Sequence, residues 1–219
     1  MSKPKLISFN VCPFVQRSVI LLKEKGVDYD IDFIDVYDPP KWFLEISPTG
    51  KVPVLQIEDE VLFESTAIGE YLEEVYDPKY HPNDPLIKAK NRAWMEYTSP
   101  LYGGTFNLLM ATNKADAVKH IDFMRFTQKG LDNVMQNTPW FNGDDFSMMD
   151  IFAAPYFVRL EFYKKNFELD ILDGCENLKA WSERLLERPS VRNSIVKDFG
   201  EVMLKRMVEN KSYLVTGAE

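Results

Sequence analysis

The chain of 219 residues is 45% hydrophobic and 27% charged, so it has enough apolar side chains for a sizeable core, and extended disorder is excluded. Its formal net charge of −8 argues against a nucleic-acid partner or an anionic membrane surface. No run approaches the roughly 18 apolar residues of a membrane helix, and the first residues lack the apolar core of a signal peptide. Since the two cysteines also lie far apart, we expect a cytoplasmic protein without disulfides.

The first 76 residues alternate between the periods of strands and helices. Apolar or alternating runs predict strands at residues 5–9, 29–36, 51–57 and 60–64. Helical spacing predicts helices at residues 13–26, within 39–50 and at 65–76. The resulting order is βαβαββα, and its strand–helix–strand start predicts a parallel strand pair joined by a crossover helix.

The sequence changes character at residues 77–85, "DPKYHPNDP", where three prolines and two aspartates predict a linker. Beyond it no strand pattern is present, and apolar spacing predicts helices at residues 86–111, 114–137, 148–166, 176–187 and 190–208. Ser147 and Asp150 form an S-x-x-D capping box before one of them. We therefore predict an α/β domain at residues 1–78, followed by an all-helical domain at residues 86–219.

Cys12 and Pro13 stand where the first predicted strand gives way to the first helix. Proline is favoured at the first helical position, so Cys12 is expected at the N-cap or just before it. The free N–H groups and the dipole of a helix start favour negative charge, which predicts a thiol pKa below its usual value of about 8.5. The alternative is a buried structural cysteine, and position alone does not separate the two.

The residues after Cys12 define what kind of reactive thiol it would be. A C-x-x-C pair resolves its own mixed disulfide, but the fourth residue here is Val15. A mixed disulfide on Cys12 would need an external thiol for its release, which indicates a small thiol co-substrate such as glutathione. Cys175 lies far off in the helical half and is expected to be a packing residue.

Two further stretches suit a peptide ligand. In "KVPVL", Pro53 marks a strand end and often accompanies a cis bond, which would leave the Val52 backbone open to an extended ligand. In "FEST", Glu64 and Ser65 open a helix, where an acid suits an ammonium group and the helix start suits a carboxylate. A plain edge strand and an ordinary serine cap are the alternatives. Together with a thiolate, these features meet the needs of the peptide γ-Glu-Cys-Gly.

Three stretches carry a family resemblance: "CPFVQR", "WFLEISPTGKVPVL" and "ESTAIGEYLEEVY". They resemble the cysteine-containing branch of the cytosolic glutathione transferases, which includes the omega class, the plant dehydroascorbate reductases and the chloride intracellular channel proteins. The likeness is specific over residues 5–76 and looser in the helical half, where "SMMDIFAAP" matches the family's capping box. It implies a thioredoxin-like first domain, glutathione as co-substrate and no metal.

The resemblance assigns roles to the matching residues. Cys12 would be the catalytic cysteine, which forms a mixed disulfide with glutathione. The other matching residues would bind glutathione: Phe14 beside the thiol, Val52 on the cysteinyl backbone, Pro53 as the cis-proline, Glu64 and Ser65 on the γ-glutamyl end, and Lys51 near the glycyl carboxylate.

One departure from the family pattern concerns the glycyl end of the ligand. Relatives often carry a lysine three residues before the tryptophan of the "WF" pair, where this chain has Pro39. Lys41 lies nearby but would point elsewhere on a helix. The sequence therefore does not decide whether Lys41 or Lys51 holds the glycyl carboxylate.

The activity implied is glutathione-dependent thiol transfer or reduction of a small electrophilic or disulfide substrate, such as dehydroascorbate reduction or deglutathionylation. The second-substrate pocket is expected between the domains, near Phe14 and the helix that carries Tyr97, Tyr102 and Phe106. Aromatic side chains at helical spacing more often pack in the core, however. The resemblance also allows a homodimer.

Three alternatives stay open at this point. One is a conjugating glutathione transferase, and another is a non-catalytic relative of the stringent-starvation type, which binds RNA polymerase. The third is a membrane-inserting, channel-like protein, which the lack of a long apolar segment disfavours. His81 and His120 show no partner at a ligand-like spacing, and we assign them no role.

Overall fold

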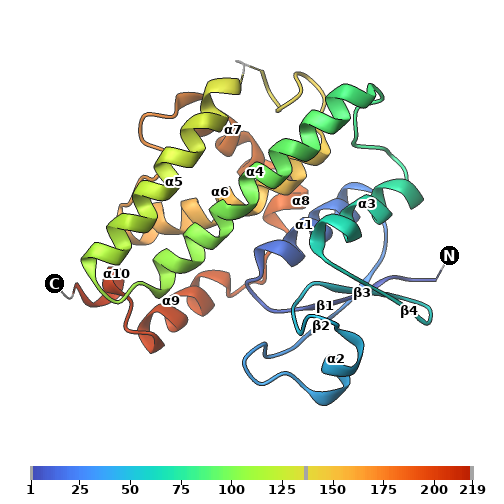
Figure 1. The fold of residues 1–219 in the computed structure, drawn as a ribbon, viewed down its shortest axis with the longest axis horizontal. Helices are drawn as coiled ribbons and strands as arrows, with labels where there is room; N and C mark the ends of the chain where they lie inside the picture. Colours follow the sequence, from blue (N-terminus) through green and yellow to red (C-terminus); the bar gives the residue numbers. More distant parts are fainter. Residues whose placement is uncertain (1, 136–137, 218–219) are drawn as a thin grey trace. The chain divides into compact units, whose positions relative to one another are not determined.

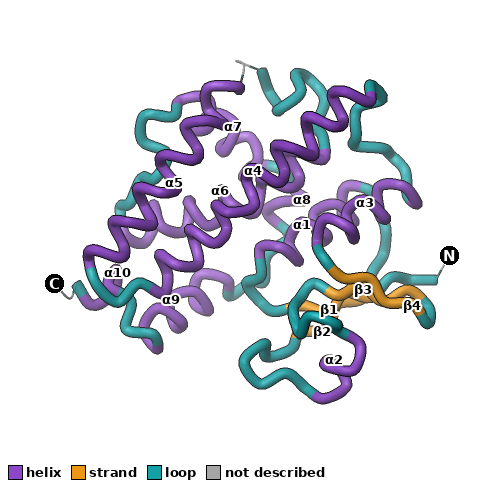
Figure 2. Tube along the Cα trace, viewed as in Figure 1, coloured by secondary structure: helices purple, strands orange, loops and turns teal. Residues whose placement is uncertain are grey.

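The computed structural model describes residues 2–135 and 138–217. The chain divides into two compact units (Figure 1). Unit 1 contains the residues up to His81 together with the segment Pro189–Lys197, and unit 2 contains Pro82–Arg188 and the residues from Asp198 onward. The sheet of the described chain lies in unit 1, whereas unit 2 is built from helices (Figure 2).

Unit 1 is built on a four-stranded sheet with the order β2-β1-β3-β4. Its strands are β1 (Lys5–Ser8), β2 (Asp30–Phe33), β3 (Val54–Ile57) and β4 (Glu60–Phe63). Strand β1 pairs with β2 in parallel, and β3 runs antiparallel to both β1 and β4. Its helices are α1 (Pro13–Glu24), α2 (Lys41–Ile46), α3 (Ser65–Val75) and the short α8 (Pro189–Arg192). The predicted order βαβαββα and the parallel first pair are confirmed.

The two faces of this sheet carry different helices (Figure 1). Ile7 and Val54, which are paired across β1 and β3, form a buried cluster with Phe43 of α2. Successive side chains of a strand point to opposite faces. The buried Leu6 and Leu55 therefore face the side that α1 and α3 cover. The sheet is thus the middle layer of unit 1.

Helices α1 and α3 run parallel and are joined by two buried cations, Arg17 within α1 and Lys25 at its C-cap. Near the start of both helices, Nη1 of Arg17 lies 3.2 Å from Oγ of Ser65. Near their ends, Nζ of Lys25 lies 2.7 Å from Oε2 of Glu73. In each pair the two residues are 48 positions apart in the chain. The same register therefore holds over about two helical turns.

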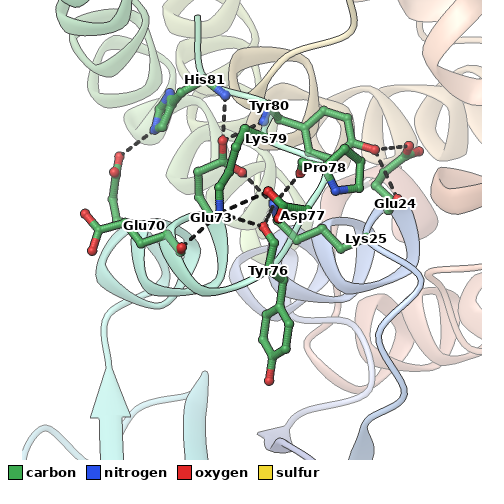
Figure 3. A network of polar contacts seen from close by, with 11 residues as sticks. Glu24, Lys25, Glu70, Glu73, Tyr76, Asp77, Pro78, Lys79, Tyr80 and His81 are labelled. Carbon is green, nitrogen blue, oxygen red and sulfur yellow. Dashed lines mark hydrogen bonds and ion pairs between the residues drawn. The ribbon is translucent and has the colours of Figure 1, made fainter. Parts of the chain in front are cut away.

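Lys25 also holds the chain segment that follows α3 (Figure 3). Its ammonium group is fully buried and donates to Glu73, to the carbonyl of Tyr76 at 2.9 Å and to the carbonyl of Pro78 at 2.7 Å. An ammonium group has three hydrogens, so these three acceptors saturate it. A buried charge pair stabilises a fold only when its remaining hydrogen-bonding positions are filled, as they are here.

The carboxylate of Glu73 and the ring of His81 extend this network. The second oxygen of Glu73 accepts the backbone N–H groups of Tyr80 and His81. Nε2 of the buried His81 lies 3.0 Å from a carboxylate oxygen of Glu70 on α3. Sequence analysis assigned His81 no role, because the turn after α3, and not a short sequence spacing, brings it back to Glu70.

The prediction of one continuous helix after α7 (Glu176–Glu187) is wrong. The sequence predicts a single helix at residues 190–208, but the structure has α8 (Pro189–Arg192) and α9 (Phe199–Glu209) instead. Between them the hydroxyl of Ser194 donates to the carbonyl of Val191 at 2.6 Å and accepts from Nε2 of Gln16 on α1 at 2.8 Å. Serine hydroxyls that bond to nearby carbonyls compete with the helical path, and apolar spacing does not reveal this.

Unit 2 is a bundle around α6 (Met148–Phe167). Every residue from 148 to 160 is buried, as expected for a helix covered on all sides. Helix α6 packs against α4 and α7, and α4 packs against α5. The helices of unit 2 are α4 (Pro85–Met110), α5 (Lys114–Val134), α6, α7 (Glu176–Glu187), α9 and α10 (Tyr213–Thr216). The sequence did not predict α10, and the last two residues of the helix predicted at 114–137 lie outside the described residues.

The capping box predicted for α6 is confirmed. Asp150 Oδ2 accepts the backbone N–H of Ser147 at 2.8 Å and its hydroxyl at 2.6 Å. Oδ1 accepts the backbone N–H of Phe141 at 2.9 Å and the indole N–H of Trp181 at 2.7 Å. Burial raises the pKa of the Asp150 carboxyl, and these four hydrogen bonds oppose the rise.

Within the described residues, no helix combines the length and the apolar character needed to cross a membrane.

The buried ion pair of Lys25 gives a direct test of what holds unit 1 together. Lys25→Met should lower the free energy of unfolding by about 3–5 kcal/mol, because it leaves the Glu73 carboxylate buried without its cation. Lys5→Met is the control, since Lys5 pairs with Asp32 at 2.6 Å while their side chains are 40% and 48% exposed. It should cost about 1 kcal/mol or less. Equal losses in urea denaturation would contradict the role given to Lys25.

Candidate functional site

Three segments with predicted site residues meet at one edge of the unit 1 sheet. Strand β1 leads into α1 through Cys12, and β4 leads into α3 through Glu64. Strand β3 is antiparallel to both β1 and β4, so it starts at the edge where they end. Val52 and Pro53 stand directly before β3. The topology therefore brings the cysteine, the proline segment and the start of α3 to the same edge.

Cys12 is the N-cap of α1, as the sequence predicts, and Pro13 is the first helical residue. The Cys12 N–H donates to the carbonyl of Phe9 at 3.0 Å, and its carbonyl accepts from the N–H of Gln16 at 3.2 Å. Cys12 is partly exposed, and within the described residues its sulfur forms no disulfide. Partial exposure at a helix start is the setting in which a thiolate is stabilised and reachable.

The peptide bond between Val52 and Pro53 is cis, as the sequence predicts. Sγ of Cys12 lies 3.9 Å from the carbonyl oxygen of Val52, so the thiol and this backbone are neighbours. The pairing of β3 with β1 ends at Val54, although the sequence predicted a strand from residue 51. Val52 therefore stands beyond the ladder, where an extended ligand can pair with its backbone.

Glu64 is the N-cap of α3 and has a positive φ of 69° with ψ of 120°. Its side chain is exposed, whereas Ser65, the first residue of α3, is 6% exposed. A residue with a Cβ atom is uncommon at positive φ, and such strained positions cluster at functional sites. Both residues stand at the helix start as predicted.

Arg17 is a residue of this region that sequence analysis did not single out. It is 1% exposed, and its Nη1 lies 3.2 Å from Oγ of Ser65. Its guanidinium carbon also lies 5.2 Å from the centre of the Phe14 ring. The i, i+3 spacing of Phe14 and Arg17 on a helix is visible in the sequence. The contact with Ser65 joins residues 48 apart in the chain, so no local sequence pattern indicated it.

Lys41 and Lys51, the two candidates for the glycyl end, both lie on the surface near α2. Lys41 is the first residue of α2, and Lys51 follows the turn after it, and both are exposed. The backbone of Lys51 belongs to that turn, where its carbonyl accepts from the hydroxyl of Ser47 at 3.2 Å. The geometry of unit 1 does not favour one lysine over the other.

The other residues considered from the sequence belong to unit 2. Tyr102 is buried, and its hydroxyl donates to the carbonyl of Phe152, so it is a core residue. Tyr97 and Phe106 are 38% and 49% exposed. Cys175 is 2% exposed, and burial raises the pKa of its thiol, which suits the predicted packing role. Over residues 2–135 and 138–217, no group of three or more His, Cys, Asp or Glu is placed to hold a metal ion.

Comparisons with known proteins decide the family. The model described as glutathione S-transferase, N-terminal domain, matches residues 11–75, and the corresponding C-terminal domain model matches residues 124–184. Glutathione S-transferase omega-1 of Rattus norvegicus is 32% identical over 189 residues, which are 84% of this chain and 77% of that protein. The chain belongs to the glutathione S-transferase family.

Further relatives narrow the branch. Glutathione S-transferase DHAR3, chloroplastic, of Arabidopsis thaliana is 28% identical over 186 residues, covering 84% of this glutathione S-transferase and 68% of its relative. The crystal structure of glutathione transferase Omega 3C from Trametes versicolor superposes with a TM-score of 0.77 at 26% identity and covers 89% of each chain. The predicted resemblance to the omega and DHAR branch and the thioredoxin-like fold of unit 1 are confirmed.

The backbone of Glu64 can be tested through stability. Glu64→Gly should be more stable than Glu64→Ala by about 1 kcal/mol, because glycine adopts a positive φ without a Cβ clash. Exposed Glu74, within α3, is the matched control. There the order should reverse, and Gly should be less stable than Ala by about 1 kcal/mol. Urea denaturation of the four variants measures both differences, and the same order at both positions would mean that Glu64 is not strained.

Proposed function

We propose that this glutathione S-transferase is a glutathione-dependent thiol transferase or reductase whose nucleophile is Cys12. The observation that carries the proposal is the single, partly exposed thiol at the start of α1, 3.9 Å from the Val52 carbonyl oxygen. A helix start favours the thiolate, which is the nucleophilic form of cysteine. The omega-class and DHAR relatives support a glutathione-dependent reaction.

In the proposed complex, glutathione lies extended along the sheet edge. Its cysteinyl backbone pairs with Val52, just before the cis-proline Pro53, as an added strand would. The γ-glutamyl ammonium faces the carboxylate of Glu64, and the γ-glutamyl carboxylate faces the hydroxyl of Ser65 and the start of α3.

The ring of Phe14 lines the thiol, and either Lys41 or Lys51 holds the glycyl carboxylate. This arrangement places the sulfur of the ligand beside Cys12, where thiol–disulfide exchange takes place.

The proposed reaction has two exchange steps. The thiolate of Cys12 attacks the glutathione sulfur of a mixed disulfide. A bond from Cys12 to that sulfur forms, the substrate disulfide bond breaks, and the leaving thiolate takes up a proton. A second glutathione thiolate then attacks the same glutathione sulfur, so that glutathione disulfide leaves and the Cys12 thiolate returns. The substrate mixed disulfide is thereby reduced to its thiol, and the glutathione is oxidised to glutathione disulfide.

Val15 explains why the second thiol must come from outside. A cysteine at this position would stand three residues after Cys12 and would resolve the adduct internally. Val15 is buried and carries no thiol, and Cys175 is buried in unit 2. The reaction therefore needs free glutathione, which fits the cytoplasmic, reducing compartment that we propose for the protein.

Conjugation of glutathione to electrophiles is the competing activity, and family membership alone supports it. In conjugation the glutathione thiolate itself is the nucleophile, and a residue that forms a disulfide with it competes with that reaction. Parallel assays of mixed-disulfide reduction, dehydroascorbate reduction and conjugation to a chloronitrobenzene separate the two activities. A protein that conjugates rapidly and reduces no disulfide would overturn the proposal.

Replacement of the two cysteines tests the proposed nucleophile. Cys12→Ser should abolish mixed-disulfide reduction and the adduct of one glutathione that forms with oxidised glutathione at neutral pH, because a hydroxyl forms no disulfide. Cys175→Ser is the matched control and should keep both, since its thiol is buried and its pKa is raised. Intact-mass analysis with peptide mapping reads out the adduct. An adduct that survives in Cys12→Ser would move the chemistry to Cys175.

A further inference from the structure

The buried guanidinium of Arg17 touches two residues of the proposed glutathione site. Arg17 is 1% exposed, and arginine is among the residue types least often buried to this extent. Its contacts include Oγ of Ser65 at 3.2 Å and the face of the Phe14 ring, whose centre lies 5.2 Å away. Burial of a charge is unfavourable unless it is paired and hydrogen-bonded, and these two contacts are part of what compensates it here.

The contact with Ser65 determines which way the serine hydroxyl points. A hydroxyl has one hydrogen to donate and two lone pairs to accept with. A guanidinium is only a donor, so the oxygen of Ser65 must be the acceptor in this pair. The hydroxyl hydrogen is then directed away from Arg17, and the positive charge behind the oxygen strengthens it as a donor. Ser65 therefore presents a donor suited to an anionic oxygen.

The same guanidinium also contacts the ring of Phe14. A cation within about 6 Å of an aromatic centre is attracted to the ring face. Phe14 is the second residue of α1, two positions after Cys12. Arg17 therefore contacts the Phe14 ring on α1 and the Ser65 hydroxyl on α3 at the same time.

We infer that Arg17 is a positioning residue that acts through Ser65, so that the site selects ligands with a free α-carboxylate on the γ-glutamyl group. This inference rests on the proposed function, because it takes Ser65 to face that carboxylate. Arg17 itself does not touch the ligand in this account. It sets the direction and strength of the one hydroxyl that does.

The second cationic contact between the same helices supplies a structural control. Lys25 and Glu73 join α1 to α3 about two turns further along, on side chains that belong to no predicted site. Glu73→Gln removes the charge of that contact and keeps an oxygen for the N–H groups of Tyr80 and His81. If Arg17 served only to hold the helices together, both changes would affect ligand binding alike.

The test compares three ligands by isothermal titration calorimetry. They are reduced glutathione, its analogue with the γ-glutamyl α-carboxylate converted to the amide, and its glycyl ethyl ester. A hydrogen bond to a charged group contributes roughly 1.5–3 kcal/mol, so the wild-type protein should bind glutathione about 10–100-fold more tightly than the α-amide. The glycyl ester reports on the opposite end of the ligand.

Arg17→Met should reduce the preference for glutathione over the α-amide to about threefold or less, as should Ser65→Ala. The preference for glutathione over the glycyl ester should stay the same in every variant. Glu73→Gln should keep both preferences. The double variant Arg17→Met with Ser65→Ala should lose no more of the preference than Ser65→Ala alone, because the two residues act in series.

Arg17→Lys provides the conservative rescue, since it keeps a positive charge and an N–H donor and should retain most of the preference. If circular dichroism shows that Arg17→Met does not fold, Arg17→Gln replaces it, with a smaller expected loss because its neutral amide can still donate to Ser65. Failure of wild-type protein to bind glutathione would overturn the proposed function. Tight binding with an undiminished α-carboxylate preference in folded Arg17→Met or Arg17→Gln would overturn this inference and leave the proposed function in place.

Discussion

The register between α1 and α3 is the constraint on which the candidate site depends. Two buried cations set it: Arg17 of α1 contacts Ser65, and Lys25, the C-cap residue of α1, contacts Glu73. Cys12 precedes α1 and Glu64 precedes α3, so a slip of one helix along the other would separate the thiol from the start of α3. Buried charges allow little adjustment, because a displaced partner leaves an uncompensated charge. The spacing is therefore fixed before any ligand arrives.

The sheet supplies the other half of the geometry. Because β3 is antiparallel to β1 and β4, one edge collects two helix starts and the segment before β3. Helix starts offer free N–H groups and partial positive charge, which suit a thiolate at one helix and a carboxylate at the other. The Val52 backbone lies beside the thiol. Under the proposed function, the sulfur and the γ-glutamyl end of glutathione would each meet a group of matching chemistry at this edge.

Much of this arrangement was predictable from the sequence, because its signals are local. Period-two and helical spacing gave the element order, and Pro13 after Cys12 located a helix start. The S-x-x-D box at Ser147 located another. The contacts of Arg17 and Lys25 were not predictable, since each joins residues 48 apart. The break between α8 and α9 was not predictable either, because the hydroxyl of Ser194 there bonds to Gln16 on α1, which is distant in sequence.

We propose that Cys12, Val52, Glu64 and Ser65 together form one glutathione site. A crystal structure of the Cys12→Ser protein with reduced glutathione tests it most directly, since the substitution prevents disulfide formation and keeps the site's size. We expect the glutathione sulfur beside residue 12, the cysteinyl backbone paired with Val52, and the γ-glutamyl carboxylate on the hydroxyl of Ser65. A ligand bound with its sulfur away from residue 12, or with its γ-glutamyl end away from α3, would contradict it.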